Sequence, residues 1–157
     1  MSTWVHVTCI VTTPVEIDME AVFGKELPLN DDWPSYNLYK QDEEKWRQDA
    51  DRIIEHNKRV WDEYEKDPDR YLPVGSEGSL KHKGHVARPD GLHEYHIDGA
   101  LRNRFDDYKY VKWFQEKFLN WLNDRDIEEA DRVHAFVSAT NGVGNLSWEY
   151  GEDRRYA

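Results

Sequence analysis

Several short stretches of the chain alternate apolar and polar residues with the period of two that a β-strand requires. The clearest is Thr3–Thr13, which is rich in β-branched residues and ends before a proline. Its odd positions from Val5 to Val11 would share one face, and its even positions from Trp4 to Ile10 the other. Four further strands are predicted at residues 80–87, 93–101, 133–140 and 145–150.

Two longer segments repeat their apolar residues every three, four or seven positions, which is the pattern of an amphipathic helix. The first is Gln41–Lys66, with acidic residues in its first turn and Pro68 just beyond its end. The second is Tyr108–Leu122, which two aspartates precede. Glu20–Phe23 is predicted to form a short helical turn within the long connection after the first strand.

Two turns are predicted from residues with special backbone geometry. Arg88–Gly91 has the sequence Arg-Pro-Asp-Gly, in which proline restricts φ and glycine supplies a positive φ. The dipeptide Asn141-Gly142 is typical of a two-residue type I′ hairpin. It is therefore expected to join the last two strands.

The resulting order of elements is strand, helix, strand, strand, helix, strand, with a closing hairpin. Both helices would bury their apolar stripes on one face of an antiparallel sheet. The predicted fold class is therefore α+β, a ferredoxin-like split β-α-β sandwich with an added C-terminal hairpin. A length of 157 residues fits a single α+β domain over 1–157.

Charge narrows the classes of function. The formal net charge is −11 at pH 7, which argues against direct binding of nucleic acid. Residues 1–70 hold 17 acidic against 9 basic residues, a net of −8, and residues 71–157 hold 15 against 12, a net of −3. The acidic excess therefore lies in the first half of the chain.

Apolar segment length and cysteine content bear on location. No stretch approaches the roughly 20 apolar residues of a membrane span, so no membrane partner is expected. The single cysteine, Cys9, lies in an apolar run and is expected to be a buried hydrophobic residue rather than a nucleophile. A lone cysteine fits a reducing compartment, so the predicted location is the cytoplasm. No cofactor is predicted.

His6 and Thr8 form a His-x-Thr motif on the first predicted strand, where both side chains would share one face. Phosphoesterases of the two-histidine type use a pair of such motifs, with one histidine as general base and the other as general acid. The second copy here would be His134-Ala135-Phe136, which lacks the hydroxyl. A phosphoesterase therefore stays an alternative, and a structural role for both histidines is favoured.

Four other histidines fall within fifteen residues, at His82, His85, His93 and His96. Imidazole is a good zinc ligand, so the cluster is a candidate metal site. On a regular strand an i, i+3 spacing sends two rings to opposite faces, but His82 could meet His96, or His85 could meet His93, across the hairpin. A partly exposed polar sheet face is favoured over a metal site.

The glycine-rich segment before the second strand is a candidate anion-binding loop. Basic residues on the neighbouring strands would add the one locally basic patch of an acidic protein. The segment has no Walker lysine and a strand follows it, so it is not a phosphate loop of that kind. The alternative is a glycine-built bulge or turn at a strand start. The candidate binding residues are Gly75, Ser76, Glu77, Gly78, Ser79, Lys81, Lys83, Arg102 and Arg104.

The outer face of the first long helix is the remaining candidate. Carboxylates spaced along a rigid helix can imitate the phosphates of a nucleic acid and occupy the groove of a protein that binds one. The candidate residues are Asp51, Glu55 and Asp62, with further acids at 49, 63 and 65. The alternative is a solvated face without a partner.

Several segments, in their order along the chain, resemble those of small bacteriophage and prophage proteins. They are Trp4–Thr8 (WVHVT), Pro73–Leu80 (PVGSEGSL), Gly99–Arg102 (GALR), Trp113 in its helix, and Trp148–Glu152 (WEYGE). The similarity covers the first strand and most of residues 72–152, and the segment around 41–66 looks like an addition to the pattern. The resemblance implies a viral setting in the cytoplasm of an infected bacterium, and it transfers no functional residues.

The leading hypothesis is a non-enzymatic phage-type protein that binds and inhibits a host protein, such as a component of a bacterial antiviral defence system. The contact would use the acidic helix face, by mimicry of nucleic acid, or the glycine-serine segment. Two alternatives stay open: a protein that sequesters a small nucleotide signal at Gly75–Ser79, and a two-histidine phosphoesterase. Exposed sheet edges also favour a homodimer.

Overall fold

The computed structural model describes residues 3–103, 108–125 and 130–151. The chain divides into two compact units. The first, here called the sheet unit, comprises the described residues up to Glu26 and from Leu72 onward. The second, here called the helical unit, is Leu27–Tyr71. The single domain over 1–157 stays a prediction.

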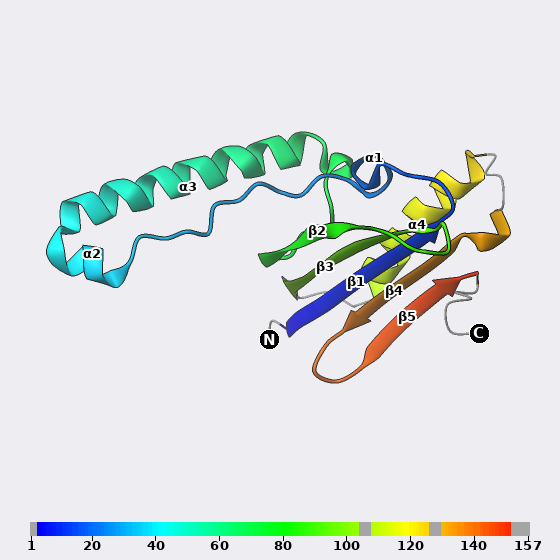
Figure 1. The fold of residues 1–157 in the computed structure, drawn as a ribbon. Coiled ribbons are helices and arrows are strands. Elements are labelled where there is room, and N and C mark those ends of the chain that lie inside the picture. Colours follow the sequence, from blue (N-terminus) through cyan, green and yellow to red (C-terminus); the bar gives the residue numbers. More distant parts are fainter. Residues whose placement is uncertain (1–2, 104–107, 126–129, 152–157) are drawn as a thin grey trace. The chain divides into compact units, whose positions relative to one another are not determined.

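Among the described residues, five antiparallel strands form one sheet in the order β2-β3-β1-β4-β5 (Figure 1). The central strand is β1 (Thr3–Thr13). It pairs with β3 (His93–Asn103) along its whole length and with β4 (His134–Thr140) over seven residues. The sheet edges are β2 (Glu77–Ala87) and β5 (Asn145–Tyr150), and a homodimer formed through them stays a prediction.

The alternation of β1 decides which of its residues form the core. Val5, Val7, Cys9 and Val11 are at most 1% exposed, and they belong to the hydrophobic core of the sheet unit. Burial raises the pKa of the Cys9 thiol well above its usual range, because the thiolate would lose its hydration. Cys9 is therefore a buried hydrophobic residue, and this prediction is confirmed.

Two α-helices described in the sheet unit, α1 and α4, pack on the core side of the sheet. α4 (Tyr108–Asn123) fully buries Phe114 and Phe118. α1 (Met19–Phe23) contributes Phe23, whose ring lies 5.5 Å from that of Phe114. Figure 1 shows α4 lying across the sheet. The other side, formed by the even-numbered residues of β1 and their cross-strand partners, is called the open face below.

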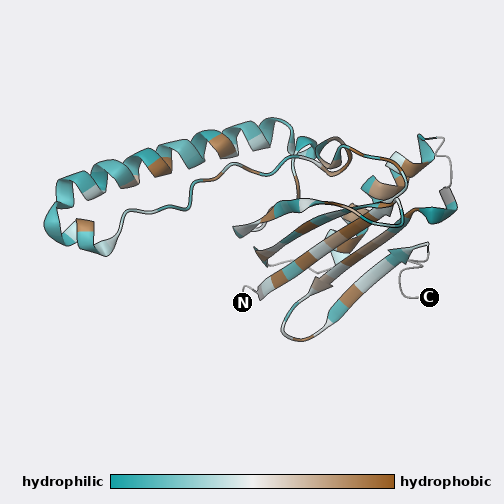
Figure 2. Cartoon of the chain, viewed as in Figure 1, coloured by the Kyte–Doolittle hydropathy of each residue, from teal (hydrophilic) through white to brown (hydrophobic). Residues whose placement is uncertain are grey.

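The helical unit contains α2 (Tyr36–Gln41) and α3 (Glu43–Lys66). Ser35 and Asp42 cap the two helices, because each side chain accepts a backbone N–H of the first turn. α3 is largely hydrophilic (Figure 2), and its buried residues are Ala50, Ile53 and Val60. In the described part of the chain, no helix is long and apolar enough to cross a membrane.

Side chains of α3 hold the extended segment that precedes α2. The Asn57 amide accepts from the backbone N–H of Asn30 (2.8 Å) and donates to the Asn30 carbonyl oxygen (3.0 Å). The Trp46 indole donates to the carbonyl oxygen of Pro34 (3.0 Å). These bonds satisfy backbone groups that lie outside any helix or strand.

The predicted α+β class is confirmed, and several boundaries are close to the predicted ones. β1 and β5 coincide with the predicted strands, and α4 ends one residue later than predicted. The turn Arg88–Gly91 is present, with a hydrogen bond from Gly91 N–H to Arg88 O (3.1 Å) and a φ of 85° at Gly91. The finer split β-α-β arrangement stays a prediction.

Other predicted details are wrong. The helix predicted from Gln41 begins at Glu43, because Gln41 ends α2 and the side chain of Asp42 caps α3. The helix in the sheet core between β1 and β2 is therefore α1, whereas α3 belongs to the helical unit. The last hairpin has a four-residue loop rather than a two-residue turn, since Asn141 N–H bonds to Gly144 O (3.0 Å) and Thr140 pairs with Asn145.

Replacement of Phe114 by alanine should test the role of α4 in the core. Phe114 is fully buried and contacts both Phe23 and Trp113. The Phe114→Ala variant should lose about 3–5 kcal/mol of unfolding free energy, measured by urea denaturation. The control Val143→Ala, at a 98% exposed position, should change it by less than about 0.5 kcal/mol. A loss below about 1 kcal/mol in Phe114→Ala would contradict this packing.

Candidate functional site

The open face of the sheet carries a histidine–carboxylate pair at its centre. His6 of β1 lies beside Asp98 of β3, with 2.9 Å between Nε2 and Oδ1. Both side chains are accessible, at 58% for His6 and 37% for Asp98. Thr8 shares this face with His6, as predicted, and lies opposite Asp98 and Ser138 in the sheet register. The pair is accessible and positioned for polar binding.

The predicted second histidine of a phosphoesterase lies far from the first. His134 is opposite Thr12 in the register, whereas His6 is opposite Thr140. Six residue positions along an antiparallel strand correspond to about 20 Å. One phosphate therefore cannot contact both histidines. His134 is buried, and its Nδ1 and the Thr12 hydroxyl have no hydrogen-bond partner in the described structure.

The glycine-serine segment builds the start of β2. Ser76 donates both its backbone N–H (2.8 Å) and its hydroxyl (3.0 Å) to the carbonyl oxygen of Arg102. Gly78 has a φ of 83°, and a Cβ there would overlap the carbonyl oxygen of Ala100. The glycines thus allow close approach of β2 to β3, which is the strand-building alternative.

The basic residues predicted around this segment are partly neutralised. Arg102 Nη1 lies 3.3 Å from Glu77 Oε1, and Lys81 Nζ lies 3.8 Å from Glu26 Oε2. Lys83 is the extra residue of a β-bulge, since His82 pairs with Ile97 and Gly84 with His96. Arg104 lies outside the described residues. Anion binding by Gly75–Ser79 stays a prediction that these contacts do not support.

The bulge at Lys83 also rearranges the histidines. It puts His82 and His85 on the same side of the sheet, so the rule for a regular strand fails here. His85 contacts His93 across the hairpin, with 2.8 Å between Nε2 and Nδ1. This is one of the two pairings that were predicted. His82 and His96 form separate hydrogen bonds, His82 Nε2 with Gly24 O (2.9 Å) and His96 Nε2 with Glu94 Oε2 (2.9 Å). They do not pair, because His82 lies opposite the core residue Ile97, whereas His96 is on the open face.

No metal centre emerges from these histidines in the part of the chain that the structure describes, because no three His, Cys, Asp or Glu side chains there are placed to hold an ion. His85 instead stacks on Tyr95 with ring centroids 4.5 Å apart. Tyr95 in turn accepts the backbone N–H of Ile17 at its hydroxyl (3.0 Å). The visible role of this group is to tie the hairpin to the chain that leads into α1.

The charges of α3 divide into paired and unpaired acids. The first turn, the middle and the last turn each contain a pair: Arg47–Glu43 (2.7 Å), Arg52–Asp49 (3.9 Å) and Lys66–Glu63 (2.8 Å). The hydrogen bond from Lys66 lowers the pKa of Glu63. By contrast, none of the candidate acids on the outer face has a cation within ion-pair distance among the described residues. These acids are Asp51, Glu55 and Asp62, here called the acidic stripe.

The acidic stripe is straight and exposed. Its members are four and seven residues apart, so they lie on one side of the helix over about 16 Å. Lys58 lies on the same side, between Glu55 and Asp62, and is the one basic interruption that the spacing indicates. The helical unit as a whole holds 13 acidic against 8 basic residues, a net of −5.

The helical unit has exposed apolar side chains, two of them next to the acidic stripe on α3, that were not predicted from the sequence. Ile54 is 53% exposed, and Trp61, seven residues later on the same side of α3, is half-buried. Trp33 and Tyr36, which precede and begin α2, are 51% and 68% exposed. The available signal was Ile54, an aliphatic residue that lies off the apolar stripe of an otherwise amphipathic helix.

No family model matches the chain, and no curated protein or solved structure matches it.

Replacement of Gly78 by alanine should distinguish a strand-building glycine from a ligand-binding one. Because of its positive φ and the clash with Ala100 O, Gly78→Ala should lower the unfolding free energy by about 1–3 kcal/mol. Gly142→Ala is the matched control, since a Cβ there meets nothing within 4 Å, and it should change the free energy by less than about 0.5 kcal/mol. Equal effects in urea denaturation would show that the Gly78 contacts are not structural.

Proposed function

We propose that this protein is a non-enzymatic, phage-type inhibitor that binds a host protein through the acidic stripe of α3. The target is a protein whose basic surface normally contacts nucleic acid, such as a component of a bacterial antiviral defence system. The resemblance of several segments to small phage proteins supports the viral setting, in which the complex forms in the cytoplasm of the infected cell.

The observation that carries the proposal is the selective pairing of charges on α3. Three of its acids form an ion pair with an arginine or lysine three or four residues away. Asp51, Glu55 and Asp62, like Glu44 and Glu65, form no ion pair in the described structure, and Lys66 interacts with Asp62 only from beyond ion-pair distance. The charge of a carboxylate that is not in an ion pair is less neutralised within the protein, so more of its field is available to a binding partner. A row of them on a rigid helix attracts a basic groove and speeds association with it.

Apolar residues beside the stripe supply what charge alone does not. Exposed ion pairs contribute little affinity, and most binding energy in protein interfaces comes from a few aromatic or aliphatic side chains that become desolvated. Ile54 and Trp61 flank the stripe and are accessible to a partner. A charged row flanked by accessible apolar side chains is more typical of a surface that binds a protein than of a surface that is only solvated.

The alternatives gain less from the geometry. A nucleotide sponge needs free donors at Gly75–Ser79, but the Ser76 N–H and hydroxyl are both bound to Arg102 O. A two-histidine phosphoesterase needs His6 and His134 near one phosphate, and their register separates them by about 20 Å.

Neutralising the acidic stripe should abolish capture of the host partner. The test variant is Asp51→Asn/Glu55→Gln/Asp62→Asn, and the matched control is Glu43→Gln/Asp49→Asn/Glu63→Gln, which removes the same charge from ion-paired acids. Tagged proteins are incubated with bacterial lysate, and the captured partner is then purified for titration. The stripe variant should bind at least about tenfold more weakly, and the control less than about threefold.

Two further readouts make the test decisive. Double-stranded DNA should displace the partner from the wild-type protein, because both would occupy the same basic surface. Lys58→Gln should tighten binding, because it removes the cation within the stripe. Equal capture by both triple variants, or no stoichiometric partner together with no effect on phage growth, would refute the proposal.

A further inference from the structure

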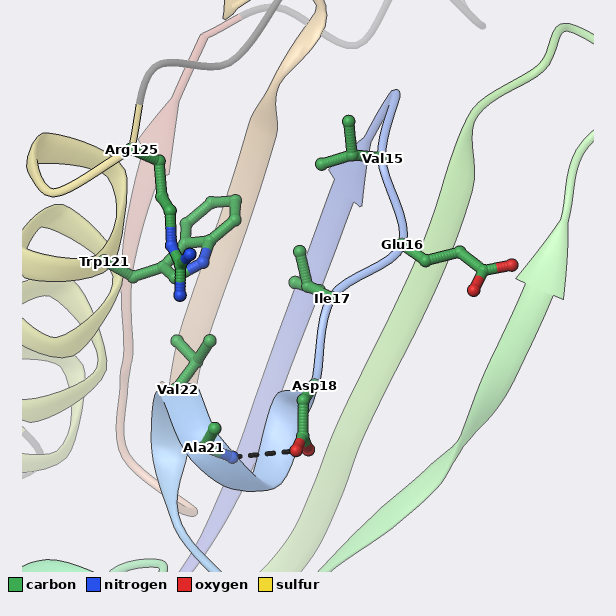
Figure 3. A pocket seen from close by; sticks show the side chains of 8 residues that line it. All are labelled: Val15, Glu16, Ile17, Asp18, Ala21, Val22, Trp121 and Arg125. Carbon is green, nitrogen blue, oxygen red and sulfur yellow. Dashed lines mark hydrogen bonds between the residues drawn. The ribbon is translucent and has the colours of Figure 1, made fainter.

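A separate pocket of about 200 Å³ lies in the sheet unit, between the connection from β1 to α1 and the end of α4. Figure 3 shows Trp121 and Arg125 on one side, facing Ile17 and Val22 on the other, with Val15 at the rim. Four of its lining side chains are apolar or aromatic and of substantial size, and Arg125 is its one basic residue. None of the residues discussed for the proposed function takes part in it.

The walls of the pocket are held in place by contacts outside it. The backbone N–H of Ile17 donates to the Tyr95 hydroxyl (3.0 Å), which ties this connection to β3. Trp121 packs on Phe118 of the core, with ring centroids 5.9 Å apart. A pre-formed pocket of this kind loses little conformational entropy when a ligand enters.

The Arg125 guanidinium is the one cation of the pocket, and it is exposed to solvent. In the described residues it has no carboxylate within ion-pair distance and no hydrogen-bond acceptor. Asp18 is engaged as the cap of α1, where it accepts from the backbone N–H groups of Glu20 (3.1 Å) and Ala21 (3.4 Å). The Glu16 carboxylate points away from the pocket (Figure 3). The pocket thus offers a cation next to apolar walls.

We propose that this pocket binds a small monocarboxylate with a branched aliphatic or aromatic tail. The carboxylate would bind the Arg125 guanidinium, which is shaped for two parallel hydrogen bonds, and the tail would lie against Val22 and Trp121. A volume near 200 Å³ is below the roughly 300–1,000 Å³ of sites for drug-sized ligands, so the ligand is small. The pocket has a single arginine and is also lined by Asp18, which favours a singly charged ligand over a doubly charged phosphate.

The direct test uses 4-methylpentanoate as the probe and 4-methylpentan-1-ol as its neutral counterpart. Both are titrated into the full-length ¹⁵N-labelled protein, and the indole N–H signal of Trp121 is followed, with Trp121→Phe for its assignment. The acid should shift this signal saturably in the millimolar range, and the alcohol should bind at least about tenfold more weakly. No shift with the acid, or equal binding of the alcohol, would overturn the proposal.

Two arginine variants show whether the charge of Arg125 is responsible. Arg125→Gln should weaken binding of 4-methylpentanoate by about tenfold or more, because the charged hydrogen bonds are lost. Arg52→Gln, on α3 and outside the pocket, should leave the affinity unchanged. Both side chains are exposed, so both variants should keep the thermal unfolding midpoint of the wild type. Equal affinities in the two variants would overturn the assignment of Arg125.

Discussion

The sheet unit depends on the pairing of β1 on both sides. All eleven residues of β1 pair with β3, and seven also pair with β4, so β1 is an interior strand of the sheet. Its odd-numbered side chains are then committed to the core beneath α1 and α4. What remains for function on β1 is its even-numbered face, with His6 next to Asp98.

The helical unit is an insertion in the connection between α1 and β2. The chain leaves β1, adds α1 to the core, and must return to form β2 at the sheet edge. The two chain segments that flank the helical unit are hydrogen-bonded to each other, since Leu72 N–H donates to Lys25 O (2.9 Å). Leu27–Tyr71 is thus closed at its base by a contact within the sheet unit, and its own contacts, such as Asn57 to Asn30, order it internally. A surface on such an insertion can change without disturbing the core.

The periodicity of the sequence was sufficient to predict much of the fold, but it predicted little of the candidate site. The alternation in Thr3–Thr13 gave both the strand and its buried face, because a strand with one face in a core needs that pattern. The bulge at Lys83 was not predictable, since it depends on pairing with β3, and it changed the face on which His85 lies. Which acids of α3 lack an ion pair was not predictable either, because spacing alone would have allowed Lys58 to pair with Glu55 or Asp62.

The division of the chain into a sheet unit that folds by itself and an inserted helical unit can be tested by excision of the helical unit. Leu27–Tyr71 is replaced by a short Gly-Ser linker, and the reactivity of the Cys9 thiol is followed during urea unfolding. Cys9 should stay protected in buffer and become reactive in one cooperative transition, because the core around β1 is built without the helical unit. A Cys9 thiol that reacts fully without denaturant would show that the sheet unit cannot fold alone and would contradict this division.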